Sequence, residues 1–141
     1  MVIQRIQTVY LLLAAIVTAV FAFVPVINVL NPDGVVEISF NSLHLGAWTM
    51  VLEMLIVILA IIAIFKYRDL KTQIRLTNVL MLLIVTLIIV IAVMMWVLHD
   101  KLIMQFTPYI VMPFVALILV WLAKKGIKHD KKLLADSERI R

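Results

Sequence analysis

Residues 79–98 read VLMLLIVTLIIVIAVMMWVL, a stretch in which Thr86 is the only polar interruption. A bilayer core about 30 Å thick takes roughly 20 helical residues to cross, and this stretch has that length. It therefore predicts a transmembrane helix in an integral membrane protein. The composition agrees, because 65% of the 141 residues are hydrophobic, which is more than soluble globular domains carry.

Three more apolar runs lie before and after this stretch, at Val9–Val29, Ala47–Phe65 and Ile103–Ala123. The last run is the weakest, because polar residues and prolines interrupt its first half. We expect four spans, with three spans and a re-entrant segment as the alternative. The predicted boundaries in a single integral membrane domain, residues 1–141, are helices at about 6–29, 47–65, 77–98 and 103–123 and a basic tail at 124–141.

The first apolar run also resembles the core of a signal peptide, because an early Arg5 precedes it. It is longer than a usual signal-peptide core, and no clean cleavage site of small residues follows it. We therefore expect a helix that is retained in the mature protein.

The basic residues predict the orientation of the chain in the membrane. Twelve of the thirteen Lys and Arg residues fall at the N-terminus, in the loop after Phe65 or in the C-terminal tail, and only Lys101 lies elsewhere. Cytoplasmic segments of membrane proteins collect Lys and Arg. Both termini and the middle loop are therefore predicted to be cytoplasmic, and the net charge of +5 is explained by topology rather than by nucleic-acid binding.

The segments between the runs predict how the helices are connected. The two later loops are short, so neighbouring helices should be antiparallel, and the fold class is an all-α up-down bundle with N-in/C-in topology. The longest loop, residues 28–46, contains the turn signal Asn31-Pro32-Asp33-Gly34 and then an alternation of apolar and polar residues. This outside loop is either a small β-hairpin paired with Val26–Leu30 or an irregular segment.

Glu53 is the one ionisable residue well inside a predicted span, roughly 9 Å from the outer boundary at 1.5 Å per residue. A charge at that depth is costly, so this side chain should face the interior of the bundle. Its expected partners are Thr18 and Tyr109. Three uses stay open, which are helix packing, docking of another subunit, and handling of a proton or cation. Kinks at Pro25, Pro108 and Pro113 either open a small cavity beside Glu53 or are tolerated bends.

A second group of candidate residues lies on the predicted cytoplasmic face. Guanidinium, ammonium and amide groups there can bind lipid phosphate or a carboxylate of a partner. The tail beyond Gly126 is either a short helix lying on the membrane surface or a direct continuation of the fourth helix. The candidates for this face are Arg5, Gln7, Gln73, Arg75, Lys131, Lys132, Arg139 and Arg141.

Signatures of enzymes and cofactor sites are missing from the sequence. There is no Gly-rich phosphate loop, no Gly-x-Ser-x-Gly and no His-Glu-x-x-His, and the chain has no cysteine. His44 and His99 have no spacing that requires a metal ion. We expect a protein without enzymatic activity, metal or cofactor.

Both ends of the chain and its middle loop carry recognisable motifs. These are Ile3-Gln4-Arg5-Ile6-Gln7-Thr8 followed by Tyr10-Leu11-Leu12-Leu13, the loop stretch Gln73-Ile74-Arg75, and the ending Ser137-Glu138-Arg139-Ile140-Arg141. They resemble a family of small four-helix inner-membrane proteins from Bacteroidetes-type bacteria, classed as a domain of unknown function. The chain departs from the family pattern at Lys131 and Glu138. The resemblance implies the fold, a bacterial inner-membrane location and no particular activity.

Three functions are compatible with these observations. The first is an accessory or assembly subunit of a larger membrane complex, which the small size and sparse polarity favour. The second is a small oligomeric transporter or channel that uses Glu53. The third is an organiser of the membrane that binds anionic lipid headgroups through the basic tail.

Overall fold

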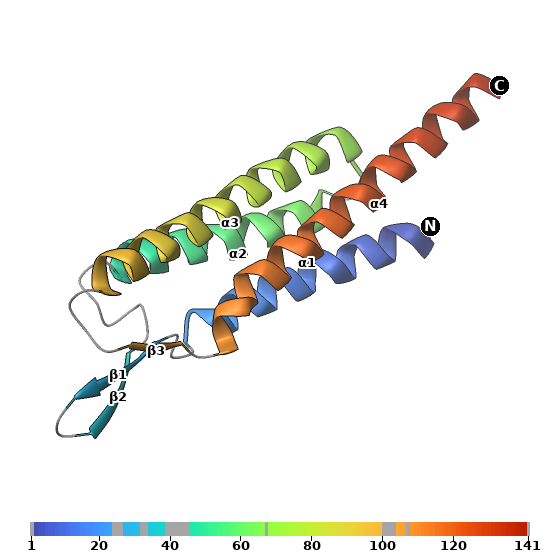
Figure 1. The fold of residues 1–141 in the computed structure, drawn as a ribbon. Coiled ribbons are helices and arrows are strands. Elements are labelled where there is room, and N and C mark those ends of the chain that lie inside the picture. The colour runs from blue at the N-terminus through green and yellow to red at the C-terminus, as the bar shows by residue number, and fades with distance from the viewer. Residues whose placement is uncertain are drawn as a thin grey trace.

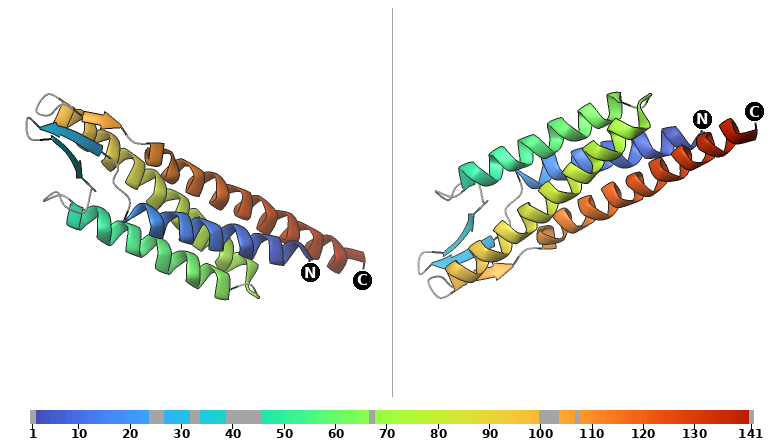
Figure 2. Two further views of the ribbon diagram at one scale, coloured as in Figure 1. Left: turned by 90° about the horizontal axis from the view of Figure 1, so that it is seen from below. Right: turned by 90° about the horizontal axis from the view of Figure 1, so that it is seen from above.

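The computed structural model describes residues 2–23, 27–31, 34–38, 46–66, 68–99, 104–106 and 108–140. In these ranges the chain forms the helices α1 (Val2–Phe21), α2 (Gly46–Phe65), α3 (Leu70–His99) and α4 (Met112–Ile140). A 3-10 turn, η2 (Pro108–Val111), directly precedes α4. The helices lie side by side and alternate in direction, and both chain ends are at the same end of the bundle (Figures 1 and 2).

Three of the helices are long and apolar enough to cross a membrane, over Trp48–Phe65, Leu70–Val97 and Pro108–Ser137. The apolar part of α1, Ile6–Phe21, is shorter. At 1.5 Å per residue it covers about 24 Å, less than a hydrocarbon core of about 30 Å. Three helices of spanning length are therefore established, and a fourth span through α1 stays a prediction.

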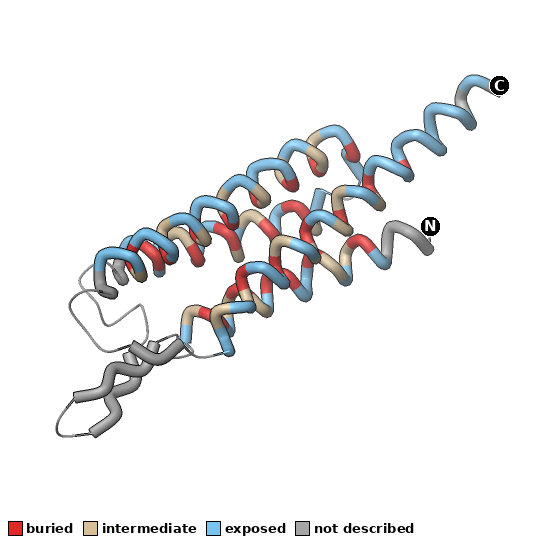
Figure 3. The backbone as a smooth tube through the Cα atoms, in the orientation of Figure 1, coloured by how far each residue is buried: buried red, intermediate tan, exposed pale blue. Residues whose placement is uncertain are grey.

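Apolar residues occur both inside the bundle and on its outside, as expected for helices that lie among lipids. The buried positions follow helical spacing along each helix, and the exposed positions between them are also large and apolar (Figure 3). A surface of this kind is too apolar for a soluble monomer. The centre of the bundle is formed by Leu11, Ala14, Ala15, Ile56, Ala60, Leu80, Ile84, Leu87, Ala116, Val120 and Ala123.

Helix boundaries differ from the sequence prediction at the end of the bundle away from the termini. The first helix was predicted to reach residue 29, but α1 ends at Phe21 and β1 (Ile27–Asn31) follows. The fourth was predicted to begin at residue 103, but β3 (Met104–Phe106) occupies this region and α4 begins at Met112. Both predictions were wrong for the same reason, since apolar residues suit a strand as well as a helix when the run is short.

The strands form a small antiparallel sheet in the order β2-β1-β3. β1 pairs with β2 (Gly34–Ile38), from Ile27 opposite Ile38 to Asn31 opposite Gly34. On its other edge β1 pairs with β3, with Ile27 opposite Phe106. The third strand was not predicted. It joins the connection after α1 to the connection between α3 and α4, at the end of the bundle opposite both termini (Figure 1).

At the other end, α4 continues without a break through Gly126 to Ile140. Of the two alternatives for the tail, the structure has the direct continuation of the fourth helix. The last turns of α4 extend beyond the neighbouring helices (Figures 1 and 2).

Candidate functional site

Glu53 is buried between helices, with 3% of its surface exposed. It lies in the second turn of α2, and apolar residues precede and follow it in the sequence. Among the described residues, the only other buried acidic side chain is Asp130, near the C-terminal end of α4. Glu53 is therefore the one buried carboxyl group among the described residues of α1, α2 and α3.

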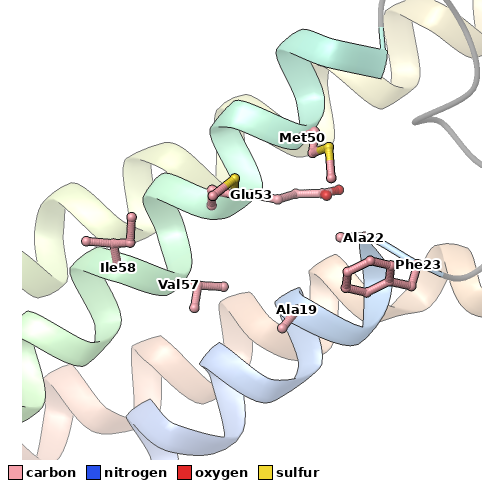
Figure 4. Close-up of a pocket in the computed structure, with 8 residues that line it drawn as sticks. Ala19, Ala22, Phe23, Met50, Glu53, Val57 and Ile58 are labelled. Carbon is pink, nitrogen blue, oxygen red and sulfur yellow. The ribbon is translucent and has the colours of Figure 1, made fainter.

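A groove of about 300 Å³ lies beside Glu53, between α1 and α2. The carboxyl group of Glu53 extends from α2 toward α1, near Ala22 and Phe23 (Figure 4). Phe23 is 78% exposed and Met54 57% exposed, so the lining reaches the outer surface of the bundle. The groove is lined by Ala19, Ala22, Phe23, Met50, Glu53, Met54, Val57 and Ile58.

Small side chains on α1 explain why the groove exists. Ala19 of α1 and Ala22, directly after its last residue, line the groove where larger residues would fill the space against α2. On the α2 side the lining includes Met50 and Met54, whose flexible side chains adapt to differently shaped neighbours. The sequence therefore produces a groove that is apolar apart from one carboxyl group.

One oxygen of this carboxyl group, Oε2 of Glu53, is buried and has no hydrogen-bond partner in the described part of the protein. The two residues predicted as partners lie elsewhere or bond elsewhere. The hydroxyl of Thr18 is buried but donates to the carbonyl oxygen of Ala14 at 2.8 Å. Tyr109 is 43% exposed in the 3-10 turn before α4. A buried polar group left without a partner costs roughly 1–3 kcal/mol.

A second set of buried polar residues lies near the end of the bundle that holds both termini. The amide Nε2 of Gln7 in α1 donates to Oδ2 of Asp130 in α4 at 2.8 Å. The amide Nε2 of Gln73 in α3 donates to the carbonyl oxygen of Ala63 in α2 at 3.1 Å. The two glutamines therefore connect different pairs of helices, and both are only 2% exposed.

The basic candidates of this end are distributed differently. Arg75, Lys131, Lys132 and Arg139 are exposed, Arg75 on α3 and the others on α4. The side chains of Arg5 and Arg141 fall outside the described part of the structure. The predicted group of arginines and glutamines is thus divided into buried amides that hold helices together and exposed cations.

Sequence reasoning missed the burial of Asp130 and the packing of α1 against Gly126. A Cβ atom at position 126 would lie 2.9 Å from Cγ of Gln7, closer than such contacts occur, so glycine allows α1 and α4 to approach here. The available signal was spacing, since Ala123, Ile127 and Asp130 continue the same buried face of α4.

An apolar layer separates the two polar ends of the bundle. Glu53 and the carbonyl of Ala63 are ten residues apart on α2, which is about 15 Å along the helix. Between these levels the buried residues of α2 are Ile56 and Ala60.

Within the described residues, no set of three or more His, Asp or Glu side chains could hold a metal ion. The side chains of His44 and His99 fall outside that part of the structure.

The family model described as a domain of unknown function (DUF4293) matches residues 3–140, so the chain belongs to this family. No curated protein and no solved structure matches the chain.

Proposed function

We propose that this member of the DUF4293 family is a non-enzymatic, multi-pass inner-membrane protein of bacteria with both termini in the cytoplasm. Its role would be that of an accessory or assembly subunit of a larger membrane complex. The observation that carries the proposal is the buried Oε2 of Glu53, which has no hydrogen-bond partner among the described residues and lies beside a groove that reaches the outer surface of the bundle.

A transmembrane helix of another subunit is the occupant that suits this groove. In lipid, helices associate through close packing at small residues and through hydrogen bonds, because lipid chains are as apolar as the side chains themselves. The groove offers both, since Ala19 and Ala22 permit close approach and Glu53 accepts a hydrogen bond. The partner helix would place a donor, such as a hydroxyl, amide or basic side chain, against Oε2.

Transport of a proton or cation through one copy of the chain is less well supported. A proton pathway needs a series of polar groups, and the apolar layer of Ile56, Ala60, Leu80 and Ile84 follows Glu53 toward the other end. The lipid-organiser alternative is also weaker. The basic tail continues α4 away from the bundle (Figure 1), so it is not a separate helix that could turn to lie along a membrane surface.

Photocrosslinking in the native membrane tests the docking proposal. A photoreactive amino acid replaces Met54 in the groove, and the matched control carries it at the next residue, Leu55, which has similar exposure but does not line this groove. We expect one discrete adduct with another membrane protein from position 54 and none from position 55.

Variants of Glu53 complete the test. Glu53→Gln keeps a carbonyl acceptor of the same shape, so the adduct should persist, whereas Glu53→Leu should reduce it about tenfold, a loss of roughly 1.4 kcal/mol. Equal adducts from both positions, or an adduct that survives Glu53→Leu unchanged, would contradict docking at this groove.

A further inference from the structure

The groove beside Glu53 limits the kind of side chain that a partner can place there. Its volume is about 300 Å³, and the described residues that line it are apolar apart from Glu53. Oε2 of Glu53 is buried and accepts no hydrogen bond from a described residue. The carboxyl group extends from α2 toward Ala22 and Phe23 (Figure 4). The groove therefore offers one acceptor in apolar surroundings.

A groove elsewhere on the bundle shows what distinguishes this one. It lies between α3 and the start of α4, has a volume of about 130 Å³, and has a wholly apolar lining that includes Ala92 and Phe114. Lipid chains can cover such a surface, because it needs no hydrogen bond. The groove beside Glu53 needs an occupant with a donor, since a buried polar group without a partner costs free energy.

The number of donors on each side-chain type narrows the choice. Lys and Arg bring several N–H donors and a charge, and no other described lining residue has a side chain that could accept the remaining bonds. The amides of Asn and Gln bring a carbonyl oxygen as well as their N–H donors. Each of these types would leave polar atoms without partners in apolar surroundings. A side chain with a single donor matches the single acceptor.

Short hydroxyl side chains are also poorly suited, because their own helix satisfies them. In this bundle the hydroxyls of Thr18, Thr77 and Thr86 each donate to the carbonyl oxygen four residues earlier, at 2.8, 2.7 and 2.8 Å. A Ser or Thr in a partner helix can make the same bond. A donor for Glu53 must therefore extend well beyond its own helix.

The lining of the groove favours an aromatic ring as the carrier of this donor. Met50 and Met54 line it, and thioether sulfurs make favourable contacts with aromatic rings. The exposed ring of Phe23 can pack edge-to-face against a second ring. Tryptophan and tyrosine are also enriched among the side chains that fill pockets at protein interfaces.

From these observations we propose that the partner helix anchors itself in the groove with a tryptophan or tyrosine. The indole N–H or phenol O–H of this residue donates to Oε2 of Glu53, and its ring packs against Met50, Met54 and Phe23. The inference rests on the proposed docking function and adds the chemistry of the partner's anchor.

Association of designed transmembrane peptides with the full-length protein in phosphatidylcholine nanodiscs tests the inference. The peptides consist of leucine and alanine and differ only in one guest residue at the depth of Glu53, which is Trp, Phe, Thr or Lys. Energy transfer between dyes on protein and peptide measures binding. We expect the Trp peptide to bind about tenfold more tightly than the other three, because Phe has a ring without a donor and the other two have donors without a ring.

Variants of the protein locate the contact. Glu53→Leu removes the acceptor and should bring the Trp and Phe peptides within about twofold of each other, whereas Glu53→Gln should keep the preference for Trp. Ala19→Leu fills the groove and should weaken binding of the Trp peptide about tenfold. The matched control is Ala92→Leu, which fills the apolar groove between α3 and α4 and should leave this binding unchanged.

Equal binding of the Trp and Phe peptides, or a preference for Trp that survives Glu53→Leu, would overturn the inference. A Thr or Lys peptide that binds most tightly and depends on Glu53 would overturn the aromatic anchor and leave docking at the groove intact. Failure of docking itself is separate, since position 54 would then give no adduct in the native membrane. The inference is also overturned if two copies of the chain associate through Glu53 and lose this association on Trp48→Phe or Trp96→Phe.

Discussion

At the scale of single residues, the contact between Gly126 and Gln7 is the clearest link between sequence and packing. Alanine is favoured over glycine within a helix by roughly 1 kcal/mol, so glycine at position 126 is a cost that its surroundings must explain. The explanation is the side chain of Gln7, whose Cγ would lie 2.9 Å from an added Cβ and whose amide is bonded to Asp130.

We therefore expect Gly126→Ala to lower the free energy of unfolding by about 1–3 kcal/mol, as overpacking does. In a Gln7→Ala background the obstacle is gone, and the same change should be neutral or should stabilise by up to about 1 kcal/mol. Unfolding in detergent micelles, followed by circular dichroism for all four members of the cycle, measures both effects. Additive effects of the two substitutions would contradict the proposed contact.

Residue types explain how much of the candidate site could be predicted. Glu53 could be found because a carboxyl group in an apolar run has few possible surroundings. Its bonding could not be predicted, because Thr18 lies at a similar depth but donates to the carbonyl of Ala14 in its own helix. Asp130 was missed because an acidic residue in a basic tail resembles a solvated one, and only the partner from α1 shows that it is buried.

At the scale of elements, apolar length predicted α2 and the C-terminal end of α3 well, and it predicted the end of α1 and both ends of α4 poorly. The run at 79–98 admits no other structure in a membrane, because it is long and has one polar residue. The short apolar segments of about five residues next to Pro25 and Pro108 can form either a helix or a strand. Strand pairing decides them, and it depends on residues as distant as Ile27 and Phe106.

The start of α3 was predicted seven residues too late, at residue 77, because polar residues concealed its first turns. Asp69 caps this helix, and its carboxylate accepts hydrogen bonds from the hydroxyl and the backbone amide of Thr72. The hydroxyl of Thr72 first, and its amide next, lower the pKa of Asp69 below its ordinary value. Because the folded-state pKa is lowered, this contribution to stability is present above the unfolded pKa of about 3.9 and is lost as pH falls.

Asp69→Ala should accordingly destabilise the protein at pH 7 and have little effect below about pH 3, where the unmodified carboxyl group is protonated as well. Asp69→Asn keeps a side-chain oxygen that can accept the capping hydrogen bond, so it should lose less stability at pH 7 than Asp69→Ala does. Thermal unfolding across this pH range measures the difference in stability between each variant and the unmodified chain. A loss of stability in Asp69→Ala that is the same at every pH would contradict the capping role.

At the scale of the whole molecule, the bundle has two ends with different chemistry. The end with the sheet holds the groove and the carboxyl oxygen of Glu53 that no described residue bonds. The end with both termini holds the bonded pair Gln7–Asp130 and the exposed last turns of α4, from Lys131 to Ser137 (Figure 1). The basic residues predict that this second end faces the cytoplasm. Between these ends the described buried residues of α2, Ile56 and Ala60, are apolar, which suits the proposed subunit role better than transport through one copy of the chain.

The proposed role of the chain as a subunit of a membrane complex can be tested directly. The most direct test is purification of the tagged protein from its native membrane in mild detergent, followed by quantitative mass spectrometry of co-eluting proteins. Glu53→Leu and Glu53→Gln are purified in parallel. We predict a stoichiometric membrane-protein partner that remains with Glu53→Gln and is lost from Glu53→Leu. A homogeneous protein that elutes alone in all three preparations would contradict the subunit proposal.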